Sequence, residues 1–460
     1  MLHFISTSSN YLLMFMCAIY ALSCFTVFLP SKESRQIRRM DRQEGFVYIF
    51  QIICFLVLTL HTKDPKVIAL CVGQLIYFKL MITIYGHFYT DCSRILMNHT
   101  CFLLSVGFVM LARLSLEKAI KQFAIVVVAS MLCLIFPIFV KKAFWLKKLR
   151  WLYGLAGLIF LATVFIIGTT KNGSTNWISL GPLALQPSEF VKISFIFFIA
   201  ATLANPPKIR TMWITILFGA LHVLILVLER DLGGAFLYFV LFVFMCFVAT
   251  GRLIYPLGGL VCGSGAAFLA YKLFSHVQAR VLAWSDPWSI IEGKGYQITQ
   301  SLFAIGTGGW FGMGLTQGRP TDIPVVDSDF IFSAISEELG MVFAICILFV
   351  YIGIFVHFIT IAMDVKDKFY KLLAFGFSIC FLFQVFLTVG GVTKFIPSTG
   401  VTLPLISYGG SSVCSTLIIF AIMQGIFMIA YETKEEYDEE EETAESMGSV
   451  DRIAIGDSEE

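Results

Sequence analysis

Charged residues are scarce in this 460-residue sequence. Asp, Glu, Lys and Arg make up 14% of the chain, and hydrophobic residues make up 58%. A soluble domain carries roughly 25% charged residues. The mean hydropathy is +0.83, and the formal net charge of +2 gives no reason to expect nucleic-acid binding. The composition excludes an ordinary soluble protein and indicates an integral membrane protein.

Features of several other protein classes are missing. There is no glycine-rich phosphate loop followed by Lys and Ser or Thr, which argues against an ATPase. The twelve cysteines are scattered, mostly within apolar segments, and lack the paired spacing of metal ligands. We interpret them as small buried hydrophobic residues. No internal repeat is visible, which weakens the case for an inverted-repeat transporter.

Apolar segments of near-spanning length, about 20 residues, occur along the whole chain. They predict an all-α, polytopic membrane protein with about thirteen helices. The predicted helices cover residues 11–30, 46–62, 67–86, 95–113, 122–140, 152–170, 189–204, 212–229, 233–250, 254–272, 329–360, 371–391 and 402–431.

Basic residues predict the orientation of these helices. Lys and Arg gather in the loops after the first, fifth, seventh, ninth and eleventh predicted helices, which all fall on one side. The positive-inside rule makes this side cytoplasmic. The N-terminus is then outside, together with the loops at 170–188, 273–328 and 392–401. The acidic C-terminal tail, 432–460, is expected to be cytoplasmic and disordered.

The longest polar stretch between apolar segments runs from Arg280 to Gly340. Within this stretch, Asp329 lies at the start of the helix predicted over 329–360. On that helix Asp329, Ser333, Ser336 and Glu337 form one polar stripe. A helix-capping charge explains Asp329 alone, but a polar stripe running into the membrane should face protein or water. We therefore expect chemistry at Asp329.

Three other stretches contain polar groups or broken backbone near the membrane. Glu189 and Lys192 share a helix face, either as an ion pair behind a helix start or as part of a cavity. Glu229, Arg230 and Asp231 form either an interfacial ion pair or a charged cluster facing a ligand. Residues 395–413 contain Pro397, Gly400, Pro404, Gly409 and Gly410. Broken backbone at membrane depth requires a protein or water-filled surrounding, so this stretch is expected to form a second wall of the cavity.

Five motifs in order resemble the shape, elongation, division and sporulation (SEDS) family, which includes RodA and FtsW. They are NWISLGPLALQPSEFVK from Asn176, RDLGGA from Arg230, GKGYQITQSLFAIGTGG from Gly293, DFIFSAISEELG from Asp329 and IPSTGVTLPLISYGGSS from Ile396. The resemblance covers about residues 95–431 and implies a ten-helix core. Residues 1–90 would be an N-terminal extension of about three helices, and residues 91–431 the core with its large outer loop at 273–328.

The resemblance also implies an activity. Members of the family polymerise lipid II into peptidoglycan strands on the outer face of the bacterial plasma membrane. Asp329 matches the family's essential aspartate and would act as the catalytic base. The substrate-binding candidates are Glu189, Lys192, Arg230, Asp231, Arg280, Lys294, Ser407, Gly409 and Gly410. The chain departs from the family pattern at Asn176, where Arg is usual, and at Arg230, where Pro is usual.

The expected reaction is an inverting displacement of undecaprenyl pyrophosphate. Cations would hold the pyrophosphate, with Mg²⁺ or Mn²⁺ as a further candidate and no organic cofactor. The expected partners are lipid II, the undecaprenyl-linked glycan, membrane lipid and a class B penicillin-binding protein. Two alternatives are a lipid II flippase and a non-catalytic scaffold of a cell-wall complex. The sequence does not distinguish elongation, division and sporulation.

Overall fold

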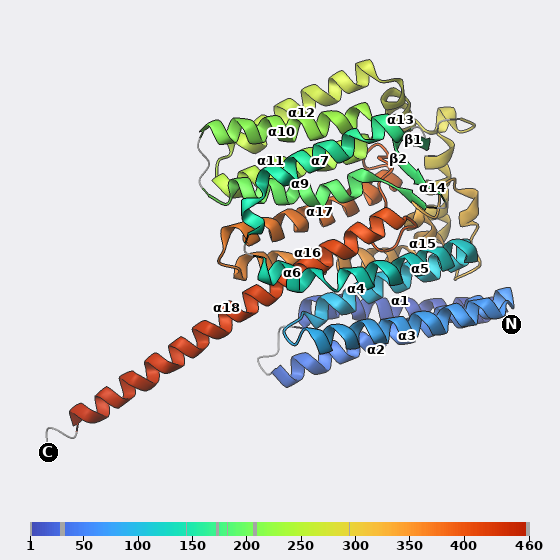
Figure 1. Cartoon of the computed structure of the whole chain (residues 1–460). Coiled ribbons are helices and arrows are strands. Elements are labelled where there is room, and N and C mark those ends of the chain that lie inside the picture. The colour runs from blue at the N-terminus through green and yellow to red at the C-terminus, as the bar shows by residue number, and fades with distance from the viewer. Residues whose placement is uncertain are drawn as a thin grey trace.

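The computed structural model describes residues 2–27, 33–143, 145–171, 174–181, 183–205, 209–293 and 295–456. Among these residues, twelve helices are long and apolar enough to cross a membrane. A further helix, α9 (Pro187–Leu203), has 17 residues and packs among them. The helices lie side by side in one bundle (Figure 1). The prediction of an all-α polytopic membrane protein is confirmed.

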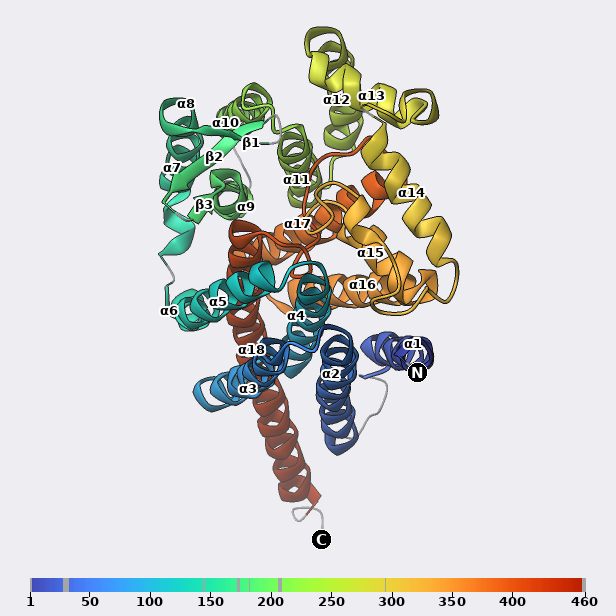
Figure 2. The same cartoon turned by 90° about the vertical axis from the view of Figure 1, so that its right-hand side faces the viewer.

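Three helices precede the ten-helix core. They are α1 (Leu2–Thr26), α2 (Glu33–Thr62) and α3 (Pro65–Phe88), and they lie against α4 (Arg94–Leu114) (Figure 2). Every residue of α4 from Ile95 to Ala112 is buried, because the three helices cover one side of α4 and the core covers the other. The three extra helices are therefore packed into the bundle.

The core continues from α5 to α18. Its helices are α5 (Leu116–Cys133), α6 (Phe136–Lys142), η1 (Leu146–Lys148), α7 (Arg150–Ala162), α8 (Val164–Ile167), α9, α10 (Ile209–Leu228), α11 (Leu232–Thr250), α12 (Ile254–Leu273), α13 (Ser275–Ser285), η2 (Trp288–Ile290), α14 (Tyr296–Gly308), η3 (Pro320–Asp322), α15 (Ile331–Leu339), α16 (Met341–Asp364), α17 (Lys368–Val392) and α18 (Gly410–Gly456). Side-chain caps explain several starts, since Ser93, Ser115, Asp231 and Asp367 each accept a hydrogen bond from an amide of the first turn.

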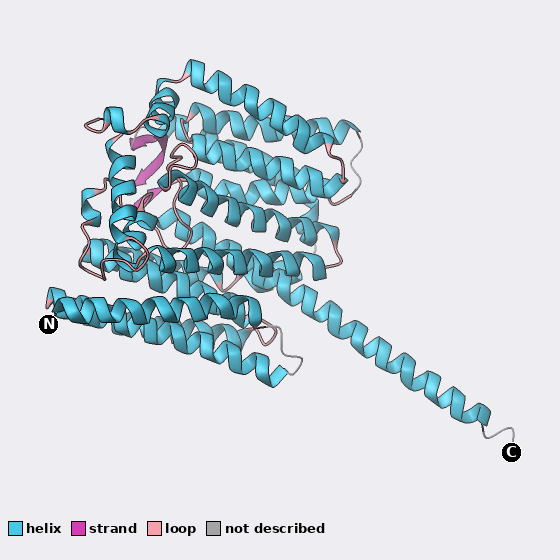
Figure 3. Cartoon of the chain, turned by 180° about the vertical axis from the view of Figure 1, so that it is seen from behind, coloured by secondary structure: helices cyan, strands magenta, loops and turns pink. Residues whose placement is uncertain are grey.

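A small antiparallel sheet interrupts the helices at one end of the bundle (Figure 3). Its strands are β1 (Thr169–Lys171), β2 (Ser174–Leu180) and β3 (Leu183–Leu185), in the order β1-β2-β3. The helix predicted over 152–170 ends at Ile167 instead. The following residues pair with β2, where Thr169 lies opposite Trp177, so strand pairing ends this helix.

The helix predicted over 329–360 is wrong as a single element. α15 ends at Leu339 and α16 begins at Met341, with Gly340 between them at a φ of +91°. A Cβ on Gly340 would lie 2.5 Å from the Gly312 nitrogen. Glycine is required here because the backbone approaches so closely and because φ is positive.

The last helix, α18, differs from its prediction at both ends. It begins at Gly410, because the residues before it form an irregular segment that includes Leu405 at a φ of +65°. It continues through Gly456 and projects away from the bundle (Figure 1). The tail predicted to be disordered is therefore helical up to this residue. Glu, Ala and Met favour helix, and no proline interrupts α18.

Candidate active site

A cavity of about 1300 Å³ lies at the end of the bundle that carries the sheet. Its wall is formed by α5, β2, α13, the segment 324–330 and the irregular segment 396–412. These segments are far apart in the sequence. They meet at the end of the bundle where α1 begins (Figure 1). The polar loops predicted to lie on one side of the membrane therefore converge on one cavity.

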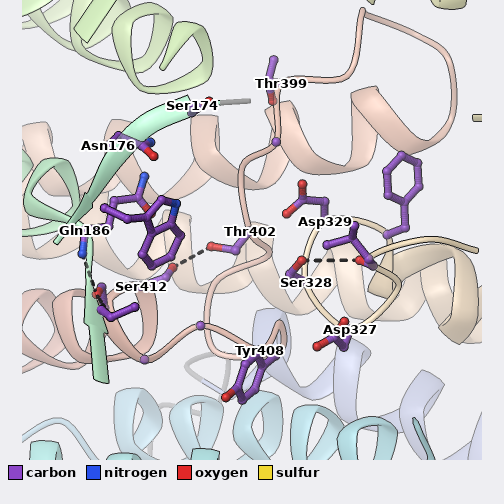
Figure 4. Close-up of a pocket in the computed structure, with 18 of the residues that line it drawn as sticks. Ser174, Asn176, Gln186, Asp327, Ser328, Asp329, Thr399, Thr402, Tyr408 and Ser412 are labelled. Atoms are coloured by element: carbon purple, nitrogen blue, oxygen red, sulfur yellow. Dashed lines mark hydrogen bonds between the residues drawn. The ribbon is translucent and has the colours of Figure 1, made fainter. Parts of the chain in front are cut away.

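Asp329 lies in the cavity wall, two residues before α15 begins. It faces the segment that contains Thr399 and Thr402 (Figure 4). A Cβ on Gly400 would lie 3.6 Å from Asp329 Oδ2 and 3.8 Å from Arg280 Nη2. Asp329 and Arg280 thus face the same small space, but they do not form an ion pair within 4 Å. Arg280 Nη1 instead donates to the carbonyl oxygens of Ser398 and Thr399.

The pKa of Asp329 is raised to about 6. Burial is the largest cause, because it disfavours the ionised carboxylate, and the negative charge of Asp327 acts in the same direction. A hydrogen bond from Ser328 and the positive charge of Arg280 act in the opposite direction. A carboxylate with this pKa is ionised at neutral pH and is a better base than an ordinary aspartate.

Asp327 is engaged differently from Asp329. Its Oδ2 atom lies 2.6 Å from Lys118 Nζ, and the Lys118 ammonium lies 5.6 Å from the centre of the Tyr408 ring. The Tyr408 amide donates to the Asp327 carbonyl oxygen at 2.7 Å. Figure 4 shows Asp327 on the Tyr408 side of the cavity, away from Thr399. Asp327 is therefore neutralised by a lysine, whereas Asp329 has no ion pair within 4 Å among the described residues.

Asp231 also lines the cavity, as predicted for a site residue. Its Oδ1 atom accepts the Gly234 amide at 2.9 Å and caps α11. Its Oδ2 atom accepts hydrogen bonds from Asn176, Gln186 and Ser188 at 2.9, 3.3 and 3.2 Å. These donors satisfy the carboxylate and join the sheet to the starts of α9 and α11. Asn176, where the resemblance leads one to expect Arg, is one of them.

Glu189 and Lys192 do not line the cavity. Their side chains form an ion pair of 2.6 Å on α9, and Lys192 is 2% exposed. Lys192 Nζ also donates to Gln384 on α17, and Ser415 on α18 donates to Glu189. The arrangement joins three helices behind the cavity wall. Glu189 and Lys192, which were predicted to bind substrate, therefore lie behind the cavity wall and not in it.

Some of the other predicted binding residues line the cavity and some do not. Arg280, Gly409 and Gly410 line the cavity, whereas Arg230 and Ser407 do not. The Arg230 backbone has a φ of +63°, and its carbonyl oxygen accepts from Ser174. Ser407 donates to the Ser328 carbonyl oxygen and thereby holds the segment next to Asp329. Lys294 lies outside the described residues.

The polar stripe predicted below Asp329 does not extend the cavity. Ser333 hydrogen-bonds Ser301 on α14 at 2.7 Å, and Ser336 donates to the Phe332 carbonyl oxygen in its own helix. Glu337 accepts the amide of Arg319 at 2.8 Å. The stripe faces protein, as its polarity required, but it fixes loops rather than contacting a ligand.

Three polar residues on α5 are part of the site or support it, although the sequence did not predict them. Lys118 and Lys121 line the cavity, and Gln122 bonds the Ser407 carbonyl oxygen and the Gly409 amide. The helix was predicted from residue 122, but it begins at Leu116 after the Ser115 cap. Ser115 is a preferred capping residue. Extending the predicted helix back to it would have placed both lysines on the same helix face as the apolar residues that follow.

Comparison with known protein families identifies the family of this chain. The model of the FtsW, RodA and SpoVE family, described as "cell cycle protein", matches residues 93–432. The chain belongs to this family. The three helices α1–α3 lie before the matched residues, so they are an addition to the family core.

Individual relatives agree with this assignment. "Peptidoglycan glycosyltransferase RodA" of Mycobacterium tuberculosis is 37% identical over 307 residues, covering 63% of this chain and 66% of that protein, just under two thirds of its length. "Probable peptidoglycan glycosyltransferase FtsW" of Saccharophagus degradans is 34% identical over 365 residues, covering 73% of this chain and 92% of that protein. The names of both relatives agree with the enzyme class expected from the motifs.

A solved structure shares the architecture of the core. The structure "Structural coordination of polymerization and crosslinking by a peptidoglycan synthase complex" contains a chain that is 26% identical to this one, with a TM-score of 0.62. The alignment covers 74% of this chain and 98% of the other. The helical core of this chain therefore has the same architecture as that chain.

Proposed function

We propose that this protein is a peptidoglycan glycosyltransferase that polymerises lipid II on the outer face of the bacterial plasma membrane. The observation that carries the proposal is Asp329, a cavity carboxylate without an ion pair whose pKa is raised to about 6. Relatives that bear this activity in their names support the proposal. A cavity of about 1300 Å³ is large enough to receive lipid-linked sugars.

In the proposed reaction Asp329 accepts the proton of the 4-hydroxyl group of the acceptor GlcNAc. The hydroxyl oxygen forms a bond to the anomeric carbon of the MurNAc that ends the growing strand. The bond from that carbon to undecaprenyl pyrophosphate breaks, and the pyrophosphate leaves with the electron pair. One displacement inverts the anomeric centre, so one base is sufficient. A positioned base contributes about 10²–10⁴-fold to the rate.

The pyrophosphate needs positive charge. Among the described residues that line the cavity, the cationic side chains are Arg280, Lys118 and Lys121. On α5 the lining continues from the lysines to apolar residues such as Val128 and Leu132. Lys118 pairs with Asp327 and Lys121 with Glu117, but the two lysine side chains are 45% and 62% exposed. We propose that they also bind phosphate oxygens and that the apolar side of α5 lies along the polyprenyl chain.

A divalent cation is a further candidate for binding the pyrophosphate. The described residues contain no group of three or more His, Cys, Asp or Glu side chains arranged to hold a metal ion. Asp327 is paired with Lys118, and Asp231 is saturated with neutral donors. Mg²⁺ often binds to one or two carboxylates and to substrate phosphates. We propose that any divalent cation enters with the pyrophosphate, and no step above requires it.

The proposed orientation places the N-terminus and the cavity outside and the C-terminus in the cytoplasm. In support of it, α1 begins at the cavity end of the bundle, and α18 leaves from the opposite end (Figure 1). At that opposite end lies the basic loop that contains Lys141, Lys142, Lys147 and Lys148. Lys141 pairs there with Glu432 of α18. A class B penicillin-binding protein is the proposed partner, in keeping with the synthase complex that contains the structural neighbour.

The test uses the purified full chain with and without a cognate penicillin-binding protein, supplied with labelled lipid II and Mg²⁺ or Mn²⁺. Wild type and Asp322→Asn should form glycan polymer on a gel, because Asp322 is exposed and lies outside the cavity lining. Asp329→Asn should form polymer at least about a hundredfold more slowly. Polymer from Asp329→Asn at more than about a tenth of the wild-type rate contradicts its role as a base. Absence of polymer from wild type, with translocation of lipid II, supports the flippase instead.

A further inference from the structure

The glycine-rich segment 309–315 connects α14 to the region of Asp329, and it lies against the junction of α15 and α16. The amides of Met313 and Gly314 donate to the carbonyl oxygens of Glu337 and Glu338 at 3.0 and 2.8 Å. The carbonyl oxygens of Gly309 and Trp310 accept the first two amides of α16 at 3.0 and 3.1 Å. One edge of the segment is therefore paired with the end of α15 and the start of α16.

The N-terminal helix α1 provides donors for other backbone groups of the same segment. Asn10 Nδ2 donates to the Phe311 carbonyl oxygen, and Ser6 Oγ donates to the Leu315 carbonyl oxygen. Asn10 and Ser6 are 3% and 2% exposed. The rings of Tyr11 and Phe311 also contact each other, with centroids 5.9 Å apart. Two buried polar side chains of α1 thus donate hydrogen bonds to one short backbone segment that lies more than 300 positions away in the sequence.

The approach between α1 and the segment is close. Gly314 has a φ of +102°, and a Cβ placed on it would lie 3.0 Å from Ser6 Oγ. Leu315 is completely buried, so water cannot replace the serine as a donor to its carbonyl oxygen. Loss of Ser6 would leave the carbonyl oxygen of the buried Leu315 unsatisfied, and loss of Asn10 would remove the donor to Phe311, so the segment would move to find other partners.

Movement of the segment would be transmitted to Asp329. Glu337 and Glu338, whose backbones hold the segment, belong to α15, a helix of nine residues that begins two residues after Asp329. The side chains of this pair hold the next part of the loop. Glu337 accepts the Arg319 amide directly. Glu338 pairs at 2.8 Å with Arg113 of α4, which donates to the Gly318 carbonyl oxygen at 3.2 Å. The loop, α15 and Asp329 therefore form one connected unit.

We propose that α1, which lies outside the family core, is a positioning element for the catalytic base. Ser6 and Asn10 are its positioning residues, because they fix the segment 309–315 and through it α15 and Asp329. They do not touch the cavity. This inference rests on the proposed function, because positioning matters only where Asp329 acts on a substrate.

The experiment compares the double variant Ser6→Ala/Asn10→Leu with Ser8→Ala in the whole chain, together with the proposed penicillin-binding partner. Ser8 lies on the same turn of α1 but is exposed, which makes it a matched control. The rate of lipid II polymerisation and the amide hydrogen exchange of peptides covering 309–319 are measured together. Asn10→Gln, which keeps an amide donor, is the conservative variant.

The double variant is expected to lower kcat about tenfold with KM changed less than about twofold, because a misplaced base slows the chemical step rather than binding. Amide exchange in 309–319 should increase, while exchange in α2 and α3 stays at the wild-type level. Ser8→Ala should match wild type, and Asn10→Gln should keep most of the wild-type rate.

Two results overturn the proposal. One is unchanged exchange in 309–319, which would mean that α1 does not hold the segment. The other is faster exchange with an unchanged kcat, which would mean that the contact does not serve catalysis. If wild type forms no polymer, the proposed function fails, and the exchange measurement still decides whether α1 fixes the segment.

Discussion

Two carboxylate–cation arrangements in this protein have opposite characters. Glu189 and Lys192 form a closed pair of 2.6 Å on α9, and further hydrogen bonds from Ser415 and to Gln384 complete it. Asp329 and Arg280 face the same part of the cavity without pairing. Both arrangements are polar groups near apolar helices, and the sequence suggested a substrate role for each.

The presence or absence of an ion pair distinguishes a charge that holds helices together from a charge that can take part in a reaction. A buried charge whose hydrogen-bonding capacity is fully used contributes to the arrangement of helices but is not free to accept a proton or bind phosphate. A carboxylate that burial makes more basic, and that no cation neutralises, is available for chemistry. Substitutions at the two places should therefore affect different properties.

The largest expected effect is on activity at Asp329. Asp329→Asn should lower the polymerisation rate by about 10²–10⁴-fold, because the base is lost. The free energy of unfolding at neutral pH should not decrease, because the amide removes a carboxylate that is costly to bury when ionised. Initial rates with labelled lipid II and thermal unfolding in the same detergent measure the two effects. A large loss of stability would mean that Asp329 is a structural charge.

The next effect is on stability at the closed pair. Lys192→Met should destabilise the protein by about 3–5 kcal/mol, because Glu189 is left buried without its partner. The double variant Glu189→Gln/Lys192→Met should recover much of this loss. The yield of monodisperse protein and its thermal midpoint are the measurements. If Lys192→Met is as stable as wild type but inactive, the pair has a direct role in the reaction and the comparison fails.

A smaller effect is expected in the pH dependence of the rate. The pKa of Asp329 is raised to about 6, and the base must be ionised to accept a proton. The rate should therefore be constant above about pH 7 and fall about tenfold for each pH unit well below 6. Initial rates between pH 4.5 and 8 measure this limb. A midpoint near 4 would show that Asp329 is not buried enough to be tuned.

The smallest effect concerns Glu229, a buried carboxyl next to Asp231 whose oxygens have no hydrogen-bond partner within the described residues. Burial, and then the charge of Asp231, raise its pKa from 4.5 to about 8. Because the folded-state pKa is the higher one, the stabilising contribution is complete below about pH 4.5 and is lost as the pH rises through 8.

Glu229→Gln should remove this dependence. The variant should be more stable than wild type above pH 8, by on the order of 1–2 kcal/mol, and the difference should disappear toward pH 5. Thermal midpoints at several pH values test this expectation. Parallel curves for the two proteins would indicate that Glu229 is paired or hydrated in the folded state.

Much of the fold and part of the site could be predicted from local patterns. Apolar segments of spanning length located the membrane helices, and the motif around Asp329 identified the carboxylate that faces the cavity. The i, i+3 spacing of Glu189 and Lys192 correctly placed them on one helix face. That spacing does not determine whether the face meets a cavity or another helix, because the partners Gln384 and Ser415 are 192 and 226 positions away.

The sequence by itself therefore determined which segments enter the membrane, since hydropathy is a local property of about 20 consecutive residues. It also determined, through its motifs, the family to which the core belongs. Only the tertiary structure decided which charged side chains are paired with another charge and which face the cavity without an ion pair. It also decided where the predicted helix breaks at Gly340 and that α1 reaches the segment 309–315. These outcomes depend on contacts between residues far apart in the chain, and the local pattern of apolar and polar residues does not predict such contacts.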